Sequence, residues 1–405
     1  DGFDLGSQIS AAGGTQGSVG GAGTIYLKDK SQAVGELHIK GSSTSGVTKL
    51  SGVIDEPVYV SNARIDLLDG TELKQNIIGT GKVIPHGTFI VPSDYLVVDG
   101  WELTLNGEHS FARVDLVNGG KIVQTAASAY ESEKLTLTVD DMLIQSGAGI
   151  YLDGRGITGE GVALDHLAGG SYGGKGGANS IEPYGSYKEP VDFGTGAVNN
   201  TSNRGGGSIK LIVNNGLTLD GYISANGVKN GDSGGSGGSI WLDVAMLSGS
   251  GSINSNGGGA FGHSNYGSGS GGRIAVYYGS LDGFDLGSQI SAAGGTQGSP
   301  GEDGTIYTEI KGGNHAVIST VPNGLVTEPV SVVDIIFNRG INPDTITVDD
   351  ISIVGPSGSV AIADVVPQND AVFRVVLAST LDLNEQFTVS VGPNIEGADG
   401  GGMDQ

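Results

Sequence analysis

The hydrophobic residues of this chain fall in short blocks that alternate with polar residues and return at a regular interval. Four blocks read GGSIKLIV at 206–213, GGSIWLDV at 238–245, GGRIAVYY at 271–278 and GTIYTEI at 304–310. Alternation of apolar and polar residues is typical of β-strands with one buried face. Each block contains an isoleucine, and these recur at nearly equal steps as Ile209, Ile240, Ile274 and Ile306. We expect these four side chains to stack in one interior ladder.

A second kind of short strand lies between these blocks. It reads IQSGAGIYLDG at 144–154, LTLDGYISANG at 217–227, LSGSGSINSNG at 247–257 and FDLGSQISAAG at 284–294. In each stretch an isoleucine follows the leading apolar residue by six positions, and a glycine comes four positions later. Glycine can adopt the positive φ of a tight corner. Short strands that recur with glycine between them indicate an all-β solenoid, and we predict a right-handed parallel β-helix over residues 1–310.

Two stretches of this predicted solenoid depart from the pattern. In the leaner first part, Ile65–Leu73 resembles Val114–Ile122, an offset that predicts two coils of about 25 residues each. Residues 155–205 do not fit the period and are predicted to be an irregular inserted loop. Because long loops on rigid scaffolds often carry binding residues, three tyrosines of this loop are candidate ligand contacts: Tyr172, Tyr184 and Tyr187. The alternative is a Gly-rich cover packed along one face of the rod.

A long string, DGFDLGSQISAAGGTQGS, occurs without a mismatch at 1–18 and again at 282–299. Its flanks also match, since GTIY stands at both 23–26 and 304–307. Such identity indicates a tandem structural duplication, whose period is the offset from Asp1 to Asp282. A coil stack that opens on the first copy would expose unpaired backbone groups. We therefore expect a strand equivalent to residues 271–281, or another subunit of a fibre, to cover that end.

From about residue 312 glycine becomes rare and longer alternating strands follow one another to the end of the chain. Their apolar positions are Val333/Ile335/Phe337, Ile346/Val348, Ile351/Ile353, Val360/Ile362, Phe373/Val375/Leu377 and Phe387/Val389/Val391. Turn sequences such as Pro322-Asn323-Gly324 and Asn342-Pro343-Asp344 separate these strands. Several short strands that alternate in this way predict a β-sandwich over residues 316–405.

A resemblance to known proteins rests on residues of both parts. The run F-x-x-x-I-x-P-x-T, formed by Phe337, Ile341, Pro343 and Thr345, resembles a bacterial immunoglobulin-like (Ig-like) domain found in arrays in large surface proteins. The blocks GGSIWLDV, GGRIAVYY and GTIYLKD resemble the Gly-rich coils of giant repetitive bacterial surface proteins, including adhesins. This resemblance implies export and exposure at the cell surface or outside the cell, and it implies no catalytic residues.

The composition of the chain limits the classes of partner that it can bind. Glycine accounts for 75 of 405 residues, cysteine is absent, and 44 acidic against 20 basic residues give a formal charge of −24. Such a surface repels nucleic acids and anionic membranes. The sequence has no apolar run long enough for a transmembrane helix, so we expect no membrane span in this segment. The expected partners are other modules or copies of the same protein and cell-surface glycans.

Catalytic and metal-binding residues must also be considered, because parallel β-helices include polysaccharide lyases and hydrolases. The candidates for acid–base chemistry are Asp153, Arg155, Asp165, His166 and Glu182. Asp153 stands at a predicted corner, where a carboxylate commonly caps a turn. Carboxylates near strand ends of the predicted sandwich could hold a structural Ca²⁺ ion: Asp334, Asp349, Asp350 and Asp399. They could equally be solvated surface charges.

These observations favour a non-catalytic structural or adhesive segment of a large exported repetitive protein. In one version of this hypothesis, the segments assemble end to end into a fibre. The alternative is a β-helix that binds or cleaves glycans. Cleavage requires a groove of acidic and basic side chains that crosses several coils, whereas a scaffold needs none.

Overall fold

The computed structural model of the chain divides into two compact units, residues 1–309 and 310–405. The structure describes residues 9–127, 133–159, 167–178, 180–197, 203–229, 232–261, 265–311, 316–322, 324, 328–337, 340–381, 386–392 and 394–397. Both units are built from β-strands, and the three helical segments in the described residues are single 3-10 turns.

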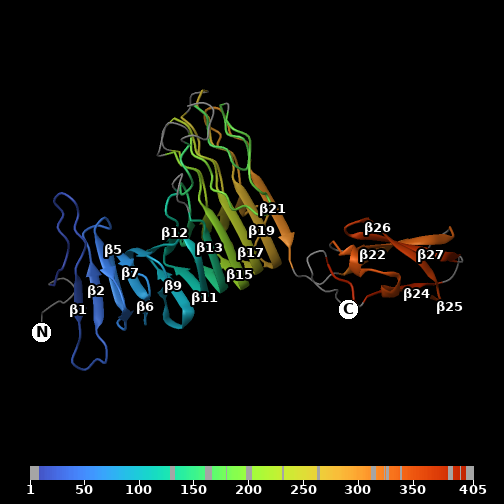
Figure 1. Cartoon of the computed structure of the whole chain (residues 1–405), viewed down its shortest axis with the longest axis horizontal. Helices are drawn as coiled ribbons and strands as arrows, with labels where there is room; N and C mark the ends of the chain where they lie inside the picture. Colours follow the sequence, from blue (N-terminus) through green and yellow to red (C-terminus); the bar gives the residue numbers. More distant parts are fainter. Residues whose placement is uncertain are drawn as a thin grey trace. The chain divides into compact units, whose positions relative to one another are not determined.

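The first unit, called the solenoid here, contains β1 to β21 (Figure 1). Its first strands are β1 (Thr24–Leu27), β2 (Glu36–Lys40), β3 (Val47–Leu50), β4 (Val53–Ile54), β5 (Val58–Leu67), β6 (Thr71–Leu73), β7 (Ile77–Pro85) and β8 (Phe89–Ile90), followed by the 3-10 turn η1 (Pro92–Asp94). The next are β9 (Tyr95–Asp99), β10 (Glu102–Thr104), β11 (Gly107–Val117), β12 (Lys121–Val123), β13 (Leu135–Ile144), β14 (Gly149–Tyr151) and β15 (Ser208–Leu219). The last are β16 (Tyr222–Ser224), β17 (Ser239–Ser248), β18 (Ser252–Asn254), β19 (Arg273–Asp282), β20 (Ile290–Ser291) and β21 (Thr305–Ile310).

Long and short strands alternate along the chain, and each pairs with the next strand of its own kind. The long strands β9, β11, β13, β15, β17, β19 and β21 form one ladder, and the short strands from β10 to β20 form another. From β9 to β19 the long-strand pairs are parallel. The sheet is nearly closed around an axis. The prediction of a parallel β-solenoid is therefore confirmed.

The predicted isoleucine ladder is present in the expected register. Ile209 pairs with Ile240, which pairs with Ile274, and at most 1% of each residue is exposed. Ile306 takes the matching place in β21, because Thr305 N donates to Gly272 O (3.0 Å) just as Arg273 N donates to Gly238 O (2.9 Å). Ile306 is nevertheless 46% exposed. Within the solenoid, the last strand of the stack keeps the register, and no further described coil of this unit follows it.

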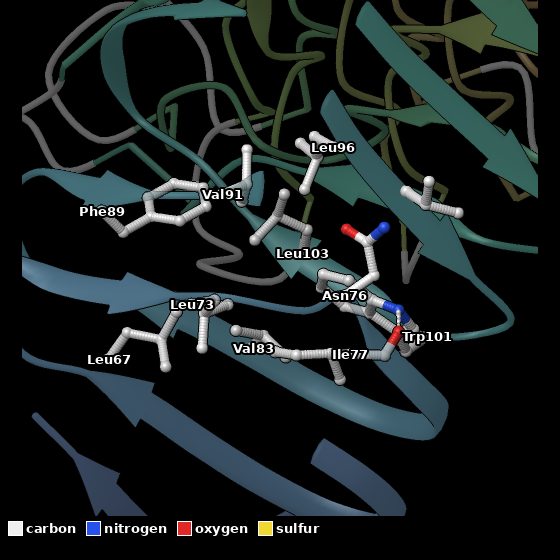
Figure 2. Close-up of a pocket in the computed structure, with 11 residues that line it drawn as sticks. Leu67, Leu73, Asn76, Ile77, Val83, Phe89, Val91, Leu96, Trp101 and Leu103 are labelled. Carbon is white, nitrogen blue, oxygen red and sulfur yellow. Dashed lines mark hydrogen bonds between the residues drawn. The ribbon is translucent and has the colours of Figure 1, made fainter. Parts of the chain in front are cut away.

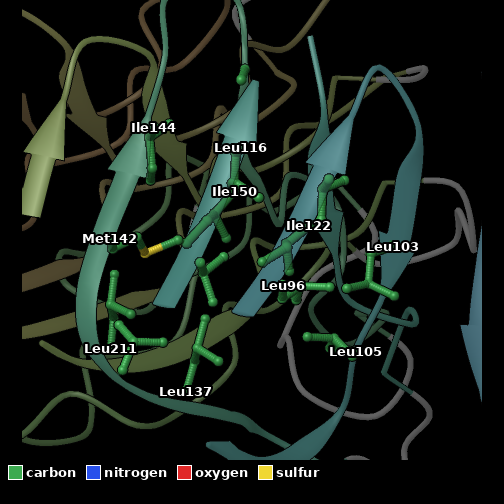
Figure 3. Packing of buried hydrophobic residues seen from close by; sticks show 14 of the residues in the cluster. Leu96, Leu103, Leu105, Leu116, Ile122, Leu137, Met142, Ile144, Ile150 and Leu211 are labelled. Atoms are coloured by element: carbon green, nitrogen blue, oxygen red, sulfur yellow. The ribbon is translucent and has the colours of Figure 1, made fainter. Parts of the chain in front are cut away.

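Long strands such as β15 turn a corner of the coil in their middle. In β15 the buried residues Leu211 and Val213 precede the exposed pair Asn214 and Asn215, and burial resumes at Leu217. The pairing register between β15 and β17 shifts at the same point. Two faces of a coil thus come from one bent strand and a third from the following short strand. Their apolar side chains meet in one continuous core (Figure 3).

Coils in the first part of the solenoid are shorter than the sequence similarity suggested. Ile65 pairs with Val83, and Leu96 pairs with Val114, so the chain completes a coil between the two members of each pair. The longer coil expected from the sequence is therefore wrong there. Ile65–Leu73 and Val114–Ile122 are similar because the sequence pattern repeats at this distance. The distance does not correspond to two coils of about 25 residues.

Glycines of the second part pack backbone against backbone. The Gly-rich segments that follow the short strands lie side by side beyond the ends of β13 to β21 and are joined by backbone hydrogen bonds (Figure 1). A Cβ atom on Gly206 would lie 1.8 Å from Ala225 O, and one on Gly271 would lie 1.8 Å from Ala292 O. Neither glycine has a positive φ. Glycine adopts the positive φ expected at a tight corner at positions such as Gly154. In these segments, by contrast, glycine is required because no side chain fits.

Small hydroxyl side chains fill the remaining space between the Gly-rich segments. Ser236, Ser268 and Ser270 are completely buried. Ser236 Oγ accepts from Thr195 N (2.9 Å), and Ser268 Oγ accepts from Ala260 N (3.0 Å). Buried polar groups that find partners stabilise a compact arrangement. The described part of the predicted irregular loop at 155–205 therefore belongs to this packed layer, as the alternative of a Gly-rich cover proposed.

A small gap in the apolar core lies in the first part of the solenoid. Leu67, Val83, Leu96 and Leu103 are among its lining residues, and Trp101 Nε1 donates to Ile77 O beside it (3.2 Å; Figure 2). Its volume is about 10 Å³. A single water needs roughly this much space, so the gap is a packing defect and no ligand site.

The second unit contains seven described strands in two antiparallel sheets. They are β22 (Val317–Val321), β23 (Val330–Phe337), β24 (Ile351–Gly355), β25 (Gly358–Ser359), β26 (Ile362–Asn369), β27 (Val372–Leu381) and β28 (Thr388–Val391), with the 3-10 turns η2 (Pro343–Thr345) and η3 (Val348–Asp350). The strand orders are β22-β23-β27-β26 and β25-β24-β28. Residues of both sheets share one core, in which the rings of Phe337 and Phe373 meet edge to face at 5.9 Å.

Two parts of the sandwich prediction can be compared with this unit. Phe337 and Ile341 of the F-x-x-x-I-x-P-x-T run are buried, and Thr345 Oγ1 donates to Asn342 O (2.9 Å). Val348, expected in a strand with Ile346, lies in η3 instead and is 41% exposed. Thr347 and Asp350 form a capping box there, and this local hydrogen bonding outweighs the alternation of the sequence.

The ladder makes a prediction about stability. Ile240→Asp places an unpaired charge in an apolar interior and should reduce the free energy of unfolding by about 4 kcal/mol or more. The matched control is Ile306→Asp, the same change at the exposed end of the ladder, which should cost no more than about 1 kcal/mol. Thermal or urea unfolding of the two variants measures the difference. Equal losses would contradict the ladder.

The glycine packing makes a second prediction. Gly271→Ala forces a methyl group against Ala292 O and Gly304 N and should destabilise the chain by about 3 kcal/mol. The control is Gly216→Ala in β15, where the nearest atom to the added Cβ is Met246 Cε at 3.5 Å and φ is not positive. This variant should stay within about 0.5 kcal/mol of the unmodified chain. If both glycines tolerate alanine equally, close backbone packing is not what selects glycine in these segments.

Candidate functional site: an aromatic stripe on the solenoid

The outward face of the last long strands carries a group of aromatic side chains. We call Trp241 of β17, Tyr277 of β19, Tyr307 of β21 and Tyr187 the aromatic stripe. Alternation within each strand places the first three outside, because their sequence neighbours Ile240, Leu242 and Val276 are buried in the core. Tyr187, which lies in the segment between β14 and β15, is 50% exposed.

The rings of the stripe contact one another in sequence. Ring centroids are 6.3 Å apart for Trp241 and Tyr277, 5.7 Å for Tyr277 and Tyr307, and 5.7 Å for Tyr187 and Tyr307. Tilted and edge-to-face rings at such distances attract each other. Since parallel strands lie about 4.8 Å apart, aromatic residues on successive coils form a continuous surface.

Two lysines lie over rings of the stripe. Lys210 Nζ is 3.7 Å from the ring centroid of Trp241, its direct neighbour in the β15–β17 register. Lys188 Nζ is 5.2 Å from the ring centroid of Tyr307. Cation–π attraction of this kind holds a lysine head group near the aromatic surface. The stripe therefore combines half-buried aromatic rings with lysine ammonium groups that lie over two of them, on a chain that is acidic as a whole.

The phenol groups of Tyr277 and Tyr307 remain protonated at neutral pH. Burial, together with the nearby charge of Glu309, raises the pKa of Tyr277 to about 12. A hydrogen bond that the Tyr307 hydroxyl donates to Glu309, together with burial, raises the pKa of Tyr307 to about 12. The hydroxyl of Tyr277 donates to Lys188 O (3.0 Å). These tyrosines can contact a ligand through ring faces and neutral hydroxyls, and they cannot act as phenolate bases.

The three tyrosines predicted as ligand contacts lie in different environments. Tyr172 is completely buried, and its hydroxyl is 2.7 Å from Ser239 Oγ. Its ring lies 4.9 Å from that of Tyr184, whose hydroxyl donates to Phe193 O (2.8 Å). Burial raises the pKa of Tyr172 to about 12 and also raises that of Tyr184. These two rings fasten the Gly-rich segment to the solenoid, and ligand contact by Tyr172, Tyr184 and Tyr187 stays a prediction.

The carboxylate predicted at a coil corner forms part of a polar ladder. Asp153 Oδ1 accepts from Asn226 N (2.7 Å) and its Oδ2 from Asn226 Nδ2 (3.1 Å). Asn226 Oδ1 accepts from Asn256 N (2.7 Å), and Asn256 Oδ1 accepts from Ala293 N (2.7 Å). Each residue thus satisfies the backbone of the next coil at the same corner. Asp153 has the capping role that the sequence allowed for it.

The other candidates for acid–base chemistry are not brought together with Asp153 in the described residues. Glu182 is a solvent-facing partner of Lys175. Arg155 Nε is buried without a hydrogen-bond partner among the described atoms. Asp165 and His166 lie outside the described residues.

Two buried carboxylates of the first part, Asp66 and Asp115, are held in ion pairs that repeat the same design. Arg64 donates to Asp66 through Nε (2.8 Å) and a terminal nitrogen (3.1 Å), and His86 Nε2 lies 2.7 Å away. Burial alone would raise the pKa of Asp66, but Arg64 and His86 outweigh it and the pKa is lowered. Arg113 pairs with Asp115 in the same way (3.0 Å). Both pairs lie in R-x-D sequences, Arg64-Ile65-Asp66 and Arg113-Val114-Asp115. The sequence similarity of the two stretches around them therefore reflects the same ion pair.

The predicted calcium ligands of the second unit have different partners. Arg374 donates to both carboxylate oxygens of Asp334 (2.7 and 2.8 Å), and this hydrogen-bonded guanidinium lowers the pKa of Asp334. Asp350 accepts from Thr347 N (2.9 Å), Asp349 is exposed, and Asp399 lies outside the described residues. No group of three metal-ligating side chains occurs in the described part of the chain. The described carboxylates do not form a site that fits Ca²⁺, and calcium binding stays a prediction.

The sequence itself contains a signal for the stripe. The blocks GGSIWLDV, GGRIAVYY and GTIYTEI place an aromatic residue at an outward position once their isoleucines are assigned to the interior. The sequence prediction instead selected tyrosines of the inserted stretch as ligand contacts, because loops often carry binding residues. Burial of Tyr172 depends on contacts with Ser239 and Arg273, which lie far away in the sequence.

Comparison with known proteins adds little to this picture. No protein-family model matches the chain, and no curated protein matches it. Among solved structures, the N-terminal part of the bacterial S-layer protein SbsC is similar over 22% of this chain and 21% of that chain, at 17% identity and a TM-score of 0.20. A likeness this low supports no conclusion about fold or function. None of the helical segments in the described residues could cross a membrane.

Proposed function

We propose that the chain is a non-catalytic structural and adhesive segment of a large, exported, repetitive bacterial protein at the cell surface. The observation that carries this proposal is that one register of interior residues, corner polar groups and close-packed glycines continues from coil to coil. Such a stack is a stiff spacer whose length depends on the number of coils. The acidic surface, with its formal charge of −24, suits a long protein that must stay soluble.

Finer features of the proposal rest on the same residues. The solenoid is a right-handed β-helix, the handedness expected when right-twisted parallel strands are connected. The second unit is an Ig-like sandwich, which its two antiparallel sheets and the buried residues Phe337 and Ile341 of the F-x-x-x-I-x-P-x-T run support. Arrays of such modules link and extend surface proteins.

The experiment that tests the location uses an antibody raised against this chain. Intact cells of the native host should be labelled, and mild protease treatment of these cells should remove the label, because the segment faces the medium. Labelling that requires permeabilised cells would refute export. An antibody against a cytosolic protein serves as the control for intact membranes.

A second candidate function, favoured by the aromatic stripe, is adhesion to neutral glycans. Exposed aromatic faces pack against the apolar faces of sugar rings, and the phenol hydroxyls and lysines can hydrogen-bond sugar hydroxyls. The rings of the stripe follow one another along the coil stack, so an extended glycan could contact several of them. The proposal includes no cleavage, because Asp153 is occupied at a corner and Asp66 and Asp115 are occupied in ion pairs.

This glycan proposal predicts the effect of two substitutions. The chain should bind linear neutral hexasaccharides in isothermal titration calorimetry, and Trp241→Ala with Tyr277→Ala should weaken binding at least tenfold. Phe261→Ala is the matched control, since Phe261 is an exposed aromatic residue outside the stripe (53%) and its loss should change nothing. Unchanged binding of the double variant, or no binding by the chain, would reject the stripe as a glycan site. Release of reducing ends that Asp153→Asn abolishes would show an enzyme instead.

A further inference from the structure

One column of residues on the outer side of the solenoid contains a member that the repeat does not require. The position before each ladder isoleucine carries Ser208, Ser239, Arg273 and Thr305 in successive coils. Ser208 pairs with Ser239, and Ser239 pairs with Arg273, in the parallel register. Three of these residues have small hydroxyl side chains, whereas Arg273 is large and charged. An arginine in such a column indicates a task beyond the stacking of coils.

Side chains of this column hold the backbone of one inserted segment. We call residues 184–192 the strap. Donors from three successive coils bond three of its carbonyls: Ser208 Oγ to Val191 O (2.8 Å), Ser239 Oγ to Asp192 O (2.6 Å) and Arg273 Nε to Tyr184 O (2.9 Å). The strap therefore crosses the outer side of the coil stack, and Arg273 anchors its first residue.

Arg273 occupies a closed site beneath the strap. Only 7% of the residue is exposed. Its guanidinium lies 5.4 Å from the ring centroid of Tyr172, which is completely buried, and a terminal nitrogen donates to Thr305 Oγ1 (3.1 Å). A buried charge is costly unless its polar atoms find partners, and the Tyr184 carbonyl is one of them. Arg273 and the strap thus hold each other in place.

The strap has a defined shape beyond this anchor. Gly185 has a φ of 74°, and a Cβ atom at this position would lie 2.5 Å from Asp192 Oδ2. Its conformation and its close packing both require glycine. Ser186 Oγ accepts from Glu189 N (3.0 Å). This hydrogen bond closes a turn, and the two residues that it encloses form the tip of the strap.

The tip consists of Tyr187 and Lys188, and both residues contact the aromatic stripe. The ring of Tyr187 lies 5.7 Å from that of Tyr307, and Lys188 Nζ lies 5.2 Å from the same ring. The hydroxyl of Tyr277 donates to Lys188 O (3.0 Å). The strap therefore adds one ring and one ammonium group to the surface that the strands form by themselves.

We infer that Arg273 is a positioning residue of the glycan site: it docks the strap, and the docked tip extends the aromatic surface of Trp241 and Tyr277. The inference rests on the glycan adhesion proposed above and specifies the ligand as a linear neutral glycan long enough to contact both the strands and the tip. A short glycan can bind on Trp241 and Tyr277 alone. Arg273 acts only through the strap, because its buried side chain cannot reach a ligand.

The experiment compares Arg273→Ser with the unmodified full chain. Serine stands at this position in the two preceding coils, so the stack keeps a residue that suits it. Hydrogen exchange should accelerate about tenfold at Tyr184 N and Glu189 N, which donate to Tyr172 O and Ser186 Oγ in the docked strap. In isothermal titration calorimetry, affinity for a linear neutral hexasaccharide should fall about fivefold. Affinity for the trisaccharide of the same sugar should not change.

Two further variants separate the anchor from general stability. Ser208→Ala is the matched control, because it removes the strap hydrogen bond at Val191 and leaves the Arg273 anchor intact. It should change neither exchange at Glu189 N nor binding. Gly185→Ala alters the strap alone, and it should reproduce the loss of hexasaccharide affinity even if Arg273→Ser lowers the melting temperature.

The outcomes distinguish this inference from the proposal on which it rests. Unchanged exchange in Arg273→Ser, or an equal loss of affinity for both glycans, would overturn the positioning role. Hexasaccharide binding that is the same in Arg273→Ser and in the unmodified chain would also reject this role and leave glycan adhesion intact. An unmodified chain that binds neither glycan would reject glycan adhesion itself, and the inference with it.

Discussion

In-register parallel stacking is the constraint on which the rest of the solenoid depends. A single coil cannot bury its apolar face, so each residue position must suit the same position one coil earlier and one coil later. Aliphatic residues therefore follow one another inside, as Ile209, Ile240 and Ile274 do. At the corner, Asp153, Asn226 and Asn256 follow one another because each satisfies the backbone of the next coil. Where the backbones approach most closely, glycine is the residue that fits.

The same constraint limits the chemistry that the surface can carry. A polar side chain that bonds the adjacent coil, such as Asp153, is occupied in a structural task, and Asp66 and Asp115 are occupied in ion pairs. Other outward positions of the long strands, such as Trp241 and Tyr277, carry aromatic residues, and stacking brings like positions together. Aromatic residues at outward positions of β17, β19 and β21 therefore become a continuous stripe, to which Tyr187 of the inserted segment adds. This geometry suits the adhesive role proposed above, because a repeating surface can bind an extended partner through many weak contacts.

Much of the fold could be predicted from the sequence because it is periodic. Alternation in GGSIWLDV determines which side chains face inward, and the spacing of the isoleucines determines which coils are neighbours. The burial of Tyr172 could not be predicted, since it depends on Ser239 and Arg273 from other coils. The reason for the many glycines was also hidden. Sequence alone does not separate a glycine with positive φ, such as Gly154, from one like Gly271 that is enclosed by backbone atoms.

The repeated string shows why one sequence can serve two positions in such a stack. Along a strand, successive residues direct their N–H and C=O groups to opposite edges, so each edge pairs independently of the other. Just after the second occurrence of the string, β21 pairs with β19. Just after the first occurrence, β1 meets β2 in antiparallel pairing, after which β2 and β5 resume parallel pairing. Residues 9–27 and 290–308 therefore make matching internal hydrogen bonds, such as Gly20 N to Gly14 O and Gly301 N to Gly295 O, although their neighbours differ.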